Sequence, residues 1–258
     1  MWTSGDSYER YVGRWSRLVA EQFLDWLAVP AGSRWLDVGC GTGALTQTVL
    51  GRAAPSRVKG VDRSAGYAEF ARQQVDDPRA EFETGDAQAL PVADGAYEAV
   101  VSGLMLNFVA QPAQAVAEMA RAAAPTGTVA VYVWDYAGKM QFMRHFWNAA
   151  AALDPAAREL DEGLRFPVCQ PEPLRQLLQG AGLRQVEVRP VDIATDFRDF
   201  DDYWSPFLGG QGPAPSYAMA LSEDRRAALC QRLRDSLPTA LDGSIPLVAR
   251  AWAVRGRR

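Results

Sequence analysis

The sequence has little basic charge, few cysteines and no long apolar run. Its 27 Lys and Arg residues against 31 Asp and Glu residues give the 258-residue chain a formal net charge of −4. The one basic cluster is Arg-Gly-Arg-Arg at 255–258, which we interpret as a solvated tail. Because nucleic-acid binding depends on a concentrated basic surface, we expect no nucleic-acid partner.

The three cysteines, Cys40, Cys169 and Cys230, are far apart and show no Cys-x-x-Cys spacing. That pattern fits neither a disulfide framework nor a structural zinc site, so we expect no metal ion and a reducing, cytoplasmic compartment. The chain has no run of about 18 apolar residues to cross a bilayer. Residues 1–15 are polar, unlike a signal peptide. We therefore expect no membrane span.

The sequence does contain a repeated alternation of short apolar segments with amphipathic ones. Apolar residues at i, i+3 and i+4 indicate helices, and short apolar or alternating runs indicate strands. This order predicts an α/β fold with a doubly wound, mostly parallel sheet. We predict strands at 34–38, 57–62, 80–86, 96–102, 127–135, 183–193 and 246–255. We predict helices at 8–28, 43–51, 65–75, 113–124, 140–153 and 222–237, with Ser64 as an N-cap and Pro125 as a helix stop.

Three glycines at alternate positions, Gly39, Gly41 and Gly43, separate the first predicted strand from its helix. Glycine has no Cβ and tolerates positive φ, so a ligand can approach the backbone there, beside the positive end of a helix. Asp62 ends the next strand, nineteen residues after Gly43, where a carboxylate can accept both hydroxyls of a ribose. The alternative interpretation is a tight turn beside an unrelated surface acid.

Two more acids help to identify the nucleoside. The dinucleotide fingerprint is Gly-x-Gly-x-x-Gly, whereas here the third glycine comes one residue early and Asp37 precedes the loop. A carboxylate at that place repels a pyrophosphate but attracts an ammonium group. Asp86 ends the third predicted strand, near the expected position of an adenine amino group. Carboxylates at three successive strand ends suit a positively charged adenosine such as S-adenosylmethionine.

Four stretches of the chain resemble successive motifs of the class I S-adenosylmethionine-dependent methyltransferases. They are LDVGCGTGALT at 36–46, GVDRSAGYAEFAR at 60–72, FETGDAQALPVADGAYEAVVS at 82–102 and AVAEMARAAAPTGTVAVYVWD at 115–135. Together with YERYVGRWSR at 8–17, they are most similar to the ubiquinone and menaquinone C-methyltransferase branch. The resemblance implies a Rossmann-like sheet of seven strands whose last strand is antiparallel. It also implies one domain, 1–258, made of a helical N-terminal cap (1–30), a cofactor-binding core (31–136), a helical substrate side (137–182) and a cover insertion between strands six and seven (194–243).

The resemblance also implies which residues bind S-adenosylmethionine. The first strand and its loop line the methionine and ribose side, Asp62 holds the ribose, and Asp86 with Ala87 meets the adenine. Arg14 approaches the cofactor's carboxylate, for which an arginine is a bidentate donor; the alternative is a solvated position on the helix face. The full predicted set is Tyr11, Arg14, Asp37, Gly39, Cys40, Gly41, Gly43, Asp62, Arg63, Tyr67, Asp86, Ala87, Ser102 and Leu104.

Methyl transfer from a sulfonium needs mainly alignment of the reactants, and a general base only when the nucleophile must lose a proton. The candidates for such a base are Asp135, which otherwise caps a loop, and His145, which otherwise packs among aromatic residues. The aromatic residues expected near the acceptor suggest an apolar or planar small molecule, although they also suit the core of a lid. They are Tyr8, Trp15, Trp134, Tyr136, Phe142, Phe146, Tyr203, Trp204 and Phe207.

The leading hypothesis is therefore a methyltransferase that acts on a small molecule and releases S-adenosylhomocysteine. Two alternatives stay open. One is a non-catalytic or regulatory protein that binds the cofactor, and the other is a nicotinamide-dependent oxidoreductase, which the glycine spacing and Asp37 oppose. The sequence leaves undecided whether carbon, oxygen or nitrogen accepts the methyl group, and it is silent on oligomeric state.

Overall fold

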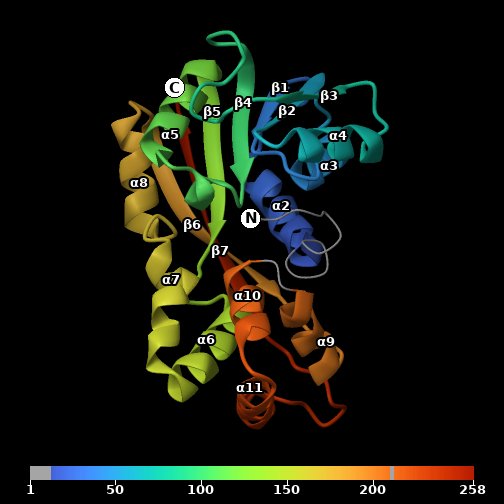
Figure 1. The fold of residues 1–258 in the computed structure, drawn as a ribbon. Helices are drawn as coiled ribbons and strands as arrows, with labels where there is room; N and C mark the ends of the chain where they lie inside the picture. Colours follow the sequence, from blue (N-terminus) through green and yellow to red (C-terminus); the bar gives the residue numbers. More distant parts are fainter. Residues whose placement is uncertain (1–12, 210–211) are drawn as a thin grey trace. The chain divides into compact units, whose positions relative to one another are not determined.

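The fold is built on a seven-stranded sheet in the order β3-β2-β1-β4-β5-β7-β6 (Figure 1). The structure is a computed structural model that describes residues 13–209 and 212–258. The sheet confirms the predicted doubly wound α/β class. Its strands are β1 (Arg34–Val38), β2 (Arg57–Asp62), β3 (Ala80–Thr84), β4 (Tyr97–Gly103), β5 (Ala123–Trp134), β6 (Arg184–Ala194) and β7 (Val248–Arg257).

The first five strands run parallel to their neighbours, and β7 runs the other way. The pairs β1–β2, β2–β3, β1–β4 and β4–β5 are all parallel. At one end of β7 the amide of Arg258 donates to the carbonyl of Gly127, and at the other end the amide of Asp135 donates to the carbonyl of Arg250. The first contact joins the end of β7 to the start of β5, and the second joins the start of β7 to the end of β5. The two strands are therefore antiparallel, which confirms the prediction for the last strand.

Apart from the first helix, whose predicted start at residue 8 lies outside the described residues, the predicted helices begin and end within two residues of the observed positions. Ser64 caps α4 as predicted, because its hydroxyl accepts from the amide of Tyr67. The α-helices are α2 (Arg14–Leu27), α3 (Ala44–Arg52), α4 (Ala65–Gln74), α5 (Pro112–Ala122), α6 (Gln141–Leu153), α7 (Glu162–Arg165), α8 (Pro171–Gly180), α9 (Phe200–Trp204), α10 (Pro213–Ala220) and α11 (Glu223–Ser236). The short 3-10 helices are η2 (Leu106–Phe108), η3 (Pro155–Leu160) and η4 (Ser205–Gly209).

The start of β5 is the predicted strand boundary that differs most from the structure. We expected Pro125 to stop the helix predicted at 113–124 and the next strand to begin at residue 127. In the structure this helix, α5, ends at Ala122, and β5 already includes Pro125. A proline pushes the residue before it, here Ala124, toward extended backbone, and the extended backbone begins one residue earlier still, at Ala123, with φ −69° and ψ 139°. The third strand also ends earlier than expected, at Thr84, two residues before Asp86.

The contacts divide the chain into two compact units. One consists of Ser16–Val133, Gln170–Val191 and Trp252–Arg258, and the other of the described residues in Met1–Trp15 with Trp134–Cys169 and Asp192–Ala251. We call them the sheet unit and the aromatic unit. The predicted division of a single domain into cap, core, substrate side and cover insertion stays a prediction.

In the sheet unit, α3 and α4 lie beside β2 and β3, and α5 contacts β4 and α8 (Figure 1). Because helices cover it, the interior of this sheet is buried on both faces. The run Trp35–Val38 is accordingly buried throughout, although it includes Asp37. A buried carboxyl group in such a strand is costly unless it is paired, so Asp37 is a candidate for function.

The aromatic unit is built around aromatic rings from α6, α9 and η4. The rings of Phe146 and Phe207 stack 4.4 Å apart, and Phe146 also meets Trp147 edge to face. Tyr203 is fully buried, and its hydroxyl donates to the carbonyl of Phe142 over 2.8 Å. These contacts give the predicted cover insertion (194–243) a packed interior that it shares with α6.

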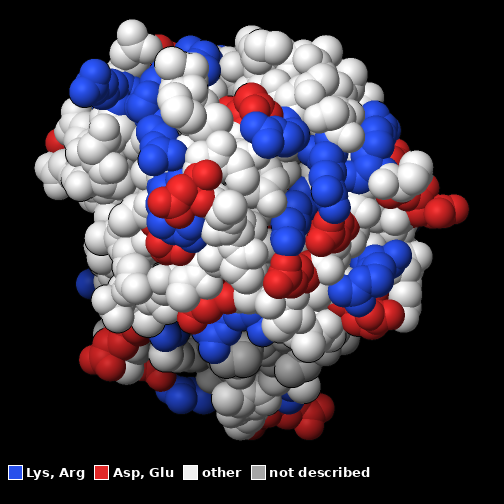
Figure 2. Space-filling view, turned by 90° about the horizontal axis from the view of Figure 1, so that it is seen from above, with Lys and Arg blue, Asp and Glu red and all other residues white. Residues whose placement is uncertain are grey.

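Charged residues of both signs are interleaved on the face of the molecule in Figure 2. In the sheet unit, ion pairs join Arg34 to Glu98 and Arg121 to Glu118. The expected absence of a nucleic-acid partner stays a prediction. Across 13–209 and 212–258, none of the helices is both long enough and apolar enough to pass through a bilayer.

Candidate functional site

The loop after β1 holds all three of its glycines at positive φ: 74° at Gly39, 53° at Gly41 and 89° at Gly43. A Cβ atom on Gly39 would lie 2.3 Å from Cγ of Met105, so the packing of that methionine requires glycine. A Cβ atom on Gly41 would meet no atom of residues 13–209 and 212–258 within 4 Å. Gly41 therefore faces open space, and a ligand can approach the main chain there.

Asp62 is the last residue of β2, and two backbone amides hold its carboxylate. Oδ2 accepts from the amide of Gly41 over 3.0 Å, and Oδ1 accepts from the amide of Ser64 over 2.8 Å. The residue is only 9% exposed, so these bonds fix its orientation. Each carboxylate oxygen can accept a further hydrogen bond. The group is therefore oriented in advance to receive two hydroxyls, as a ribose offers.

Asp37, in β1, is buried to 1% exposure with half of its carboxyl group unused. Its Oδ2 accepts from the hydroxyl of Thr46 over 2.7 Å, while Oδ1 has no hydrogen-bond partner in the described part of the chain. Burial, with a smaller contribution from the charge of Asp62, raises the pKa of Asp37 to about 7 against the lowering effect of the hydrogen bond from Thr46. A nearby cation would favour the ionised form of this group.

Five predicted cofactor residues line one pocket in the sheet unit. They are Gly39, Asp62, Arg63, Asp86 and Ala87. The pocket therefore brings together the ends of three successive strands, as the sequence predicted. Its other lining residues are Val61, Gly85, Gln88, Met105, Phe108, Val109 and Ala110.

The segment after β4 is the part of this pocket that the sequence analysis missed. Only Leu104 was selected there, whereas the lining residues are Met105 and the run from Phe108 to Ala110. Phe108 is half exposed although it is a large apolar residue. The signal was available, because ligands of parallel sheets collect at the carboxyl ends of strands and this segment follows such an end.

Seven predicted cofactor residues of the sheet unit do not line this pocket: Asp37, Cys40, Gly41, Gly43, Tyr67, Ser102 and Leu104. Ser102 is completely buried, and its hydroxyl has no hydrogen-bond partner in the described part of the chain. Leu104 has a φ of 59°, unusual for a residue other than glycine. Burial raises the pKa of the Cys40 thiol, so that thiol is unreactive. Tyr67 is partly buried in α4, where burial raises its pKa.

The predicted residues of the N-terminal segment are only partly described. Tyr8 and Tyr11 lie outside the described residues. Arg14 belongs to the aromatic unit, where its Nη1 lies 3.1 Å from Asp202 and its guanidinium stacks on Trp15 and Phe197. Its Nε and Nη2 atoms are buried with no hydrogen-bond partner among residues 13–209 and 212–258. That edge of a guanidinium suits a carboxylate, and its assignment to the cofactor stays a prediction.

All the described aromatic residues predicted for the acceptor pocket fall in the aromatic unit. Six of them are buried: Trp134, Phe142, Phe146, Tyr203, Trp204 and Phe207. Trp15 and Tyr136 are partly exposed. In this structure the six buried residues form core, which was the alternative interpretation of the pattern. Their role toward an acceptor stays a prediction.

The two candidate bases have different surroundings. Asp135 is 4% exposed, and its two carboxylate oxygens accept from the amides of Gly138 and Lys139. This is the loop role that the sequence left open. His145 lies half-buried on α6, where burial lowers its pKa. In the part of the chain that is described, no cluster of His, Cys, Asp and Glu could hold a metal ion.

Comparison with known proteins identifies the family. The family model described as a methyltransferase domain matches residues 36–131. The 2-phytyl-1,4-naphtoquinone methyltransferase of Thermosynechococcus vestitus is 32% identical over 181 residues, which cover 65% of this chain and 80% of that protein. The chain belongs to the class I S-adenosylmethionine-dependent methyltransferases.

Two further methyltransferases show how similarity is distributed. The demethylmenaquinone methyltransferase of Renibacterium salmoninarum is 36% identical over 118 residues, covering 46% of each chain. A solved structure of a putative methyltransferase from Bacillus halodurans superposes with a TM-score of 0.61 at 14% identity, covering 92% of this chain and 97% of that one. These matches confirm the predicted branch and the Rossmann-like fold.

S-adenosylmethionine is therefore the methyl donor, and the site of this methyltransferase fits it. The open side of Gly41 allows a close approach, Asp62 presents an oriented carboxylate, and Asp37 holds an unpartnered oxygen in the adjacent strand. The donor carries an ammonium and a sulfonium, which suit a site with two buried carboxyl groups. The individual contacts of the predicted residues stay predictions.

Proposed function

We propose that the chain transfers the methyl group of S-adenosylmethionine to a small apolar or aromatic acceptor by direct displacement. Two relatives are named for a naphthoquinone and for a demethylmenaquinone, both apolar planar molecules. The observation that carries the proposal is the pocket lined by Asp62 and Asp86 within a chain of this family.

The cofactor half of the proposal assigns one role to each strand end. Asp62 accepts hydrogen bonds from both ribose hydroxyls, and Asp86 accepts one from the adenine amino group. Asp37 favours the cationic methionine portion through its charge. Asp86 is exposed and its Oδ1 already accepts from the amide of Gln88 over 2.9 Å, so its orientation is set before the cofactor arrives.

The reaction moves one electron pair from the acceptor to the methyl carbon. The bond between that carbon and sulfur breaks, its electrons stay on sulfur, and S-adenosylhomocysteine leaves neutral at that atom. The protein has mainly to hold the two reactants in line and to exclude water, which lowers the barrier by about 7–11 kcal/mol when the alignment is good. A base is needed only if the acceptor atom bears a proton.

The acceptor class is tested with methyl-labelled S-adenosylmethionine and a panel of quinones, phenols, isoprenoids and amines. We expect label in the quinones or phenols, and product analysis will show which atom carries it. Transfer confined to polar amines would contradict an apolar acceptor, and binding of the cofactor without transfer to any class would favour the non-catalytic alternative.

The ribose assignment is tested with Asp62→Ala. We expect binding of S-adenosylhomocysteine to weaken by about 1.5–3 kcal/mol, since hydrogen bonds to a charged group are lost. Asp25→Ala is the control, because it removes an exposed carboxylate of the same unit that pairs with Arg52. Calorimetric titration of both folded variants decides, and unchanged affinity in Asp62→Ala would show that the assignment is wrong.

A further inference from the structure

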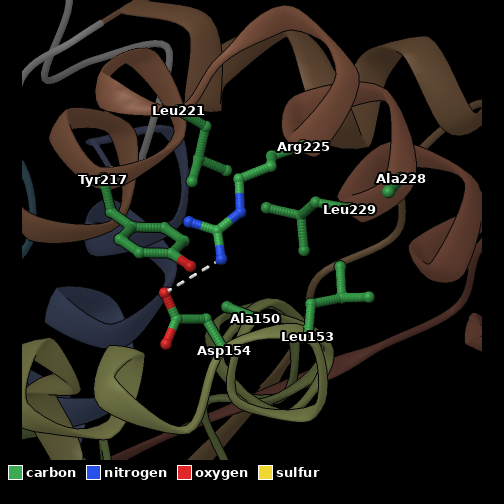
Figure 3. A pocket seen from close by; sticks show the side chains of 8 residues that line it. All are labelled: Ala150, Leu153, Asp154, Tyr217, Leu221, Arg225, Ala228 and Leu229. Atoms are coloured by element: carbon green, nitrogen blue, oxygen red, sulfur yellow. Dashed lines mark ion pairs between the residues drawn. The ribbon is translucent and has the colours of Figure 1, made fainter.

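A second pocket lies within the aromatic unit, between α6, α10 and α11 (Figure 3). Its cavity of about 110 Å³ is lined mostly by apolar side chains. For scale, an engineered apolar cavity of about 150 Å³ in another protein accommodates benzene. The lining residues are Ala150, Leu153, Asp154, Tyr217, Leu221, Arg225, Ala228 and Leu229.

Three polar groups of this pocket gather at one place. Figure 3 shows the guanidinium of Arg225 between Tyr217 and Leu229, with the Asp154 carboxylate beside the Tyr217 hydroxyl. Nη2 of Arg225 lies 3.5 Å from Oδ2 of Asp154, at the outer limit of a hydrogen bond. The pocket therefore combines an apolar interior with a loosely paired cation at its edge.

Hydrogen-bond donors outnumber acceptors at this edge. A guanidinium has five N–H donors, and the long contact with Asp154 is its one ion pair in the described part of the chain. The acceptor side is more fully used, since Oδ1 of Asp154 also accepts from the amide of Ala156 over 3.1 Å. An added ligand is therefore favoured if it brings acceptor oxygens, and a carboxylate matches the guanidinium best.

We propose that this pocket binds a small monocarboxylic acid with an apolar chain. Its carboxylate contacts Arg225 at the edge, and its chain lies among Ala150, Leu153, Leu221 and Leu229. The site is separate from the cofactor pocket, whose lining residues all lie in the sheet unit. The proposal does not depend on which acceptor the enzyme methylates.

The pocket is connected to the aromatic core through Tyr217. Its ring lies 5.7 Å from that of Trp147 and 6.3 Å from that of Phe146. Binding beside Tyr217 should therefore change the environment of Trp147, and this provides a spectroscopic signal that does not depend on catalysis.

The test is a ligand-observed NMR titration with hexanoate, hexanol and hexylammonium, supported by tryptophan emission. We expect saturable hexanoate binding in the millimolar range or tighter, and binding of the other two at least about tenfold weaker, because they lack the interaction with Arg225. Absence of saturable hexanoate binding up to ~20 mM would overturn the proposal. Tighter binding of hexylammonium would also overturn it, since the pocket would then select a cation.

Two pairs of variants place the ligand. Arg225→Gln should weaken hexanoate binding about tenfold or more, whereas Arg226→Gln, on the neighbouring residue outside the lining, should not. Ala228→Leu fills the cavity from the exposed side of α11 and should abolish binding, whereas Ala227→Leu should leave it intact. All four changes are on partly or fully exposed residues, and thermal melts verify folding. Hexanoate binding that survives both Arg225→Gln and Ala228→Leu would show that the ligand binds elsewhere.

Discussion

Asp37 offers the sharpest test of the site, because its burial makes stability depend on pH. Its carboxyl group lies in β1 at 1% exposure, with one oxygen bonded to Thr46 and the other unpartnered in the described part of the chain. Burial raises its pKa from 3.8 to about 7. The variant Asp37→Asn keeps the size of the side chain and an oxygen for Thr46, but it cannot ionise.

The sign follows from proton binding in the two states. Below about pH 4 the carboxyl group is neutral in both the folded and the unfolded chain. The stabilising contribution of the raised pKa is then at its maximum. Between about pH 4 and pH 7 the unfolded chain ionises this group while the folded chain keeps it protonated, so the contribution falls as pH rises and is lost once pH has passed the folded pKa of about 7. At about 1.4 kcal/mol for each pKa unit, wild type should lose about 2.5 kcal/mol relative to Asp37→Asn between pH 5 and pH 8.

The assay is urea denaturation of both proteins without cofactor at several pH values. Groups that the two proteins share cancel in the difference between their free energies of unfolding. If that difference stays constant within about 0.5 kcal/mol from pH 5 to pH 8, Asp37 does not have a raised pKa and our reasoning about its burial is wrong.

The same group gives a prediction about the cofactor. If S-adenosylmethionine binds only the ionised form of Asp37, its affinity should rise about tenfold from pH 6 to pH 8, since the pKa lies between them. Asp37→Asn should lack this dependence. A wild-type affinity that does not change with pH would refute the role of Asp37 toward the cationic portion of the cofactor.

Three other changes test the two units separately. Gly41→Ala should lower stability by about 1 kcal/mol because φ is positive there, and it should also weaken cofactor binding about tenfold or more. The control is Gly32→Ala, at a φ of 79° and equally open among the described residues, which should lower stability alone. Thermal melts measure the effect on stability, and titrations with the cofactor measure the effect on binding. Tyr203→Phe should cost about 1 kcal/mol of unfolding free energy in urea, since its buried bond to Phe142 is lost, and an unchanged value would contradict that bond. Burial raises the pKa of Glu162 to about 7, so wild type should lose stability relative to Glu162→Gln as pH rises from about 4.5 through 7; parallel profiles would contradict this.

Much of the fold was predictable because its signals are local. A buried apolar run such as β1 and a cap such as Ser64 act within a few residues, and both were placed correctly. The start of β5 was not, because two local rules compete there. We assumed that the proline stops the helix at its own position, but a proline also restricts the residue before it, and β5 already begins two residues ahead of Pro125.

The candidate site was predictable only in its polar part. Asp62 and Asp86 could be placed because strand ends in a parallel sheet share one edge, and their pocket agrees with that placement. The apolar residues after β4 also follow a strand end, but they carry no charge that would mark them as ligand contacts. The packing of Met105 over Gly39 depends on a side-chain rotamer and on two segments that are far apart in the chain. The pattern of glycines could therefore predict that some group approaches the main chain, but not that the group at Gly39 is a side chain of the same protein.

That contact changes what the glycine loop means. The sequence suggested that all three glycines make room for a ligand, yet each has a different reason to be glycine. Gly39 admits the side chain of Met105, Gly43 begins α3 at a φ of 89°, and only Gly41 leaves its side open. Part of the motif therefore serves the packing of the chain itself. Among the three, a substitution at Gly41 is the one whose effect on cofactor affinity can be separated from its effect on folding.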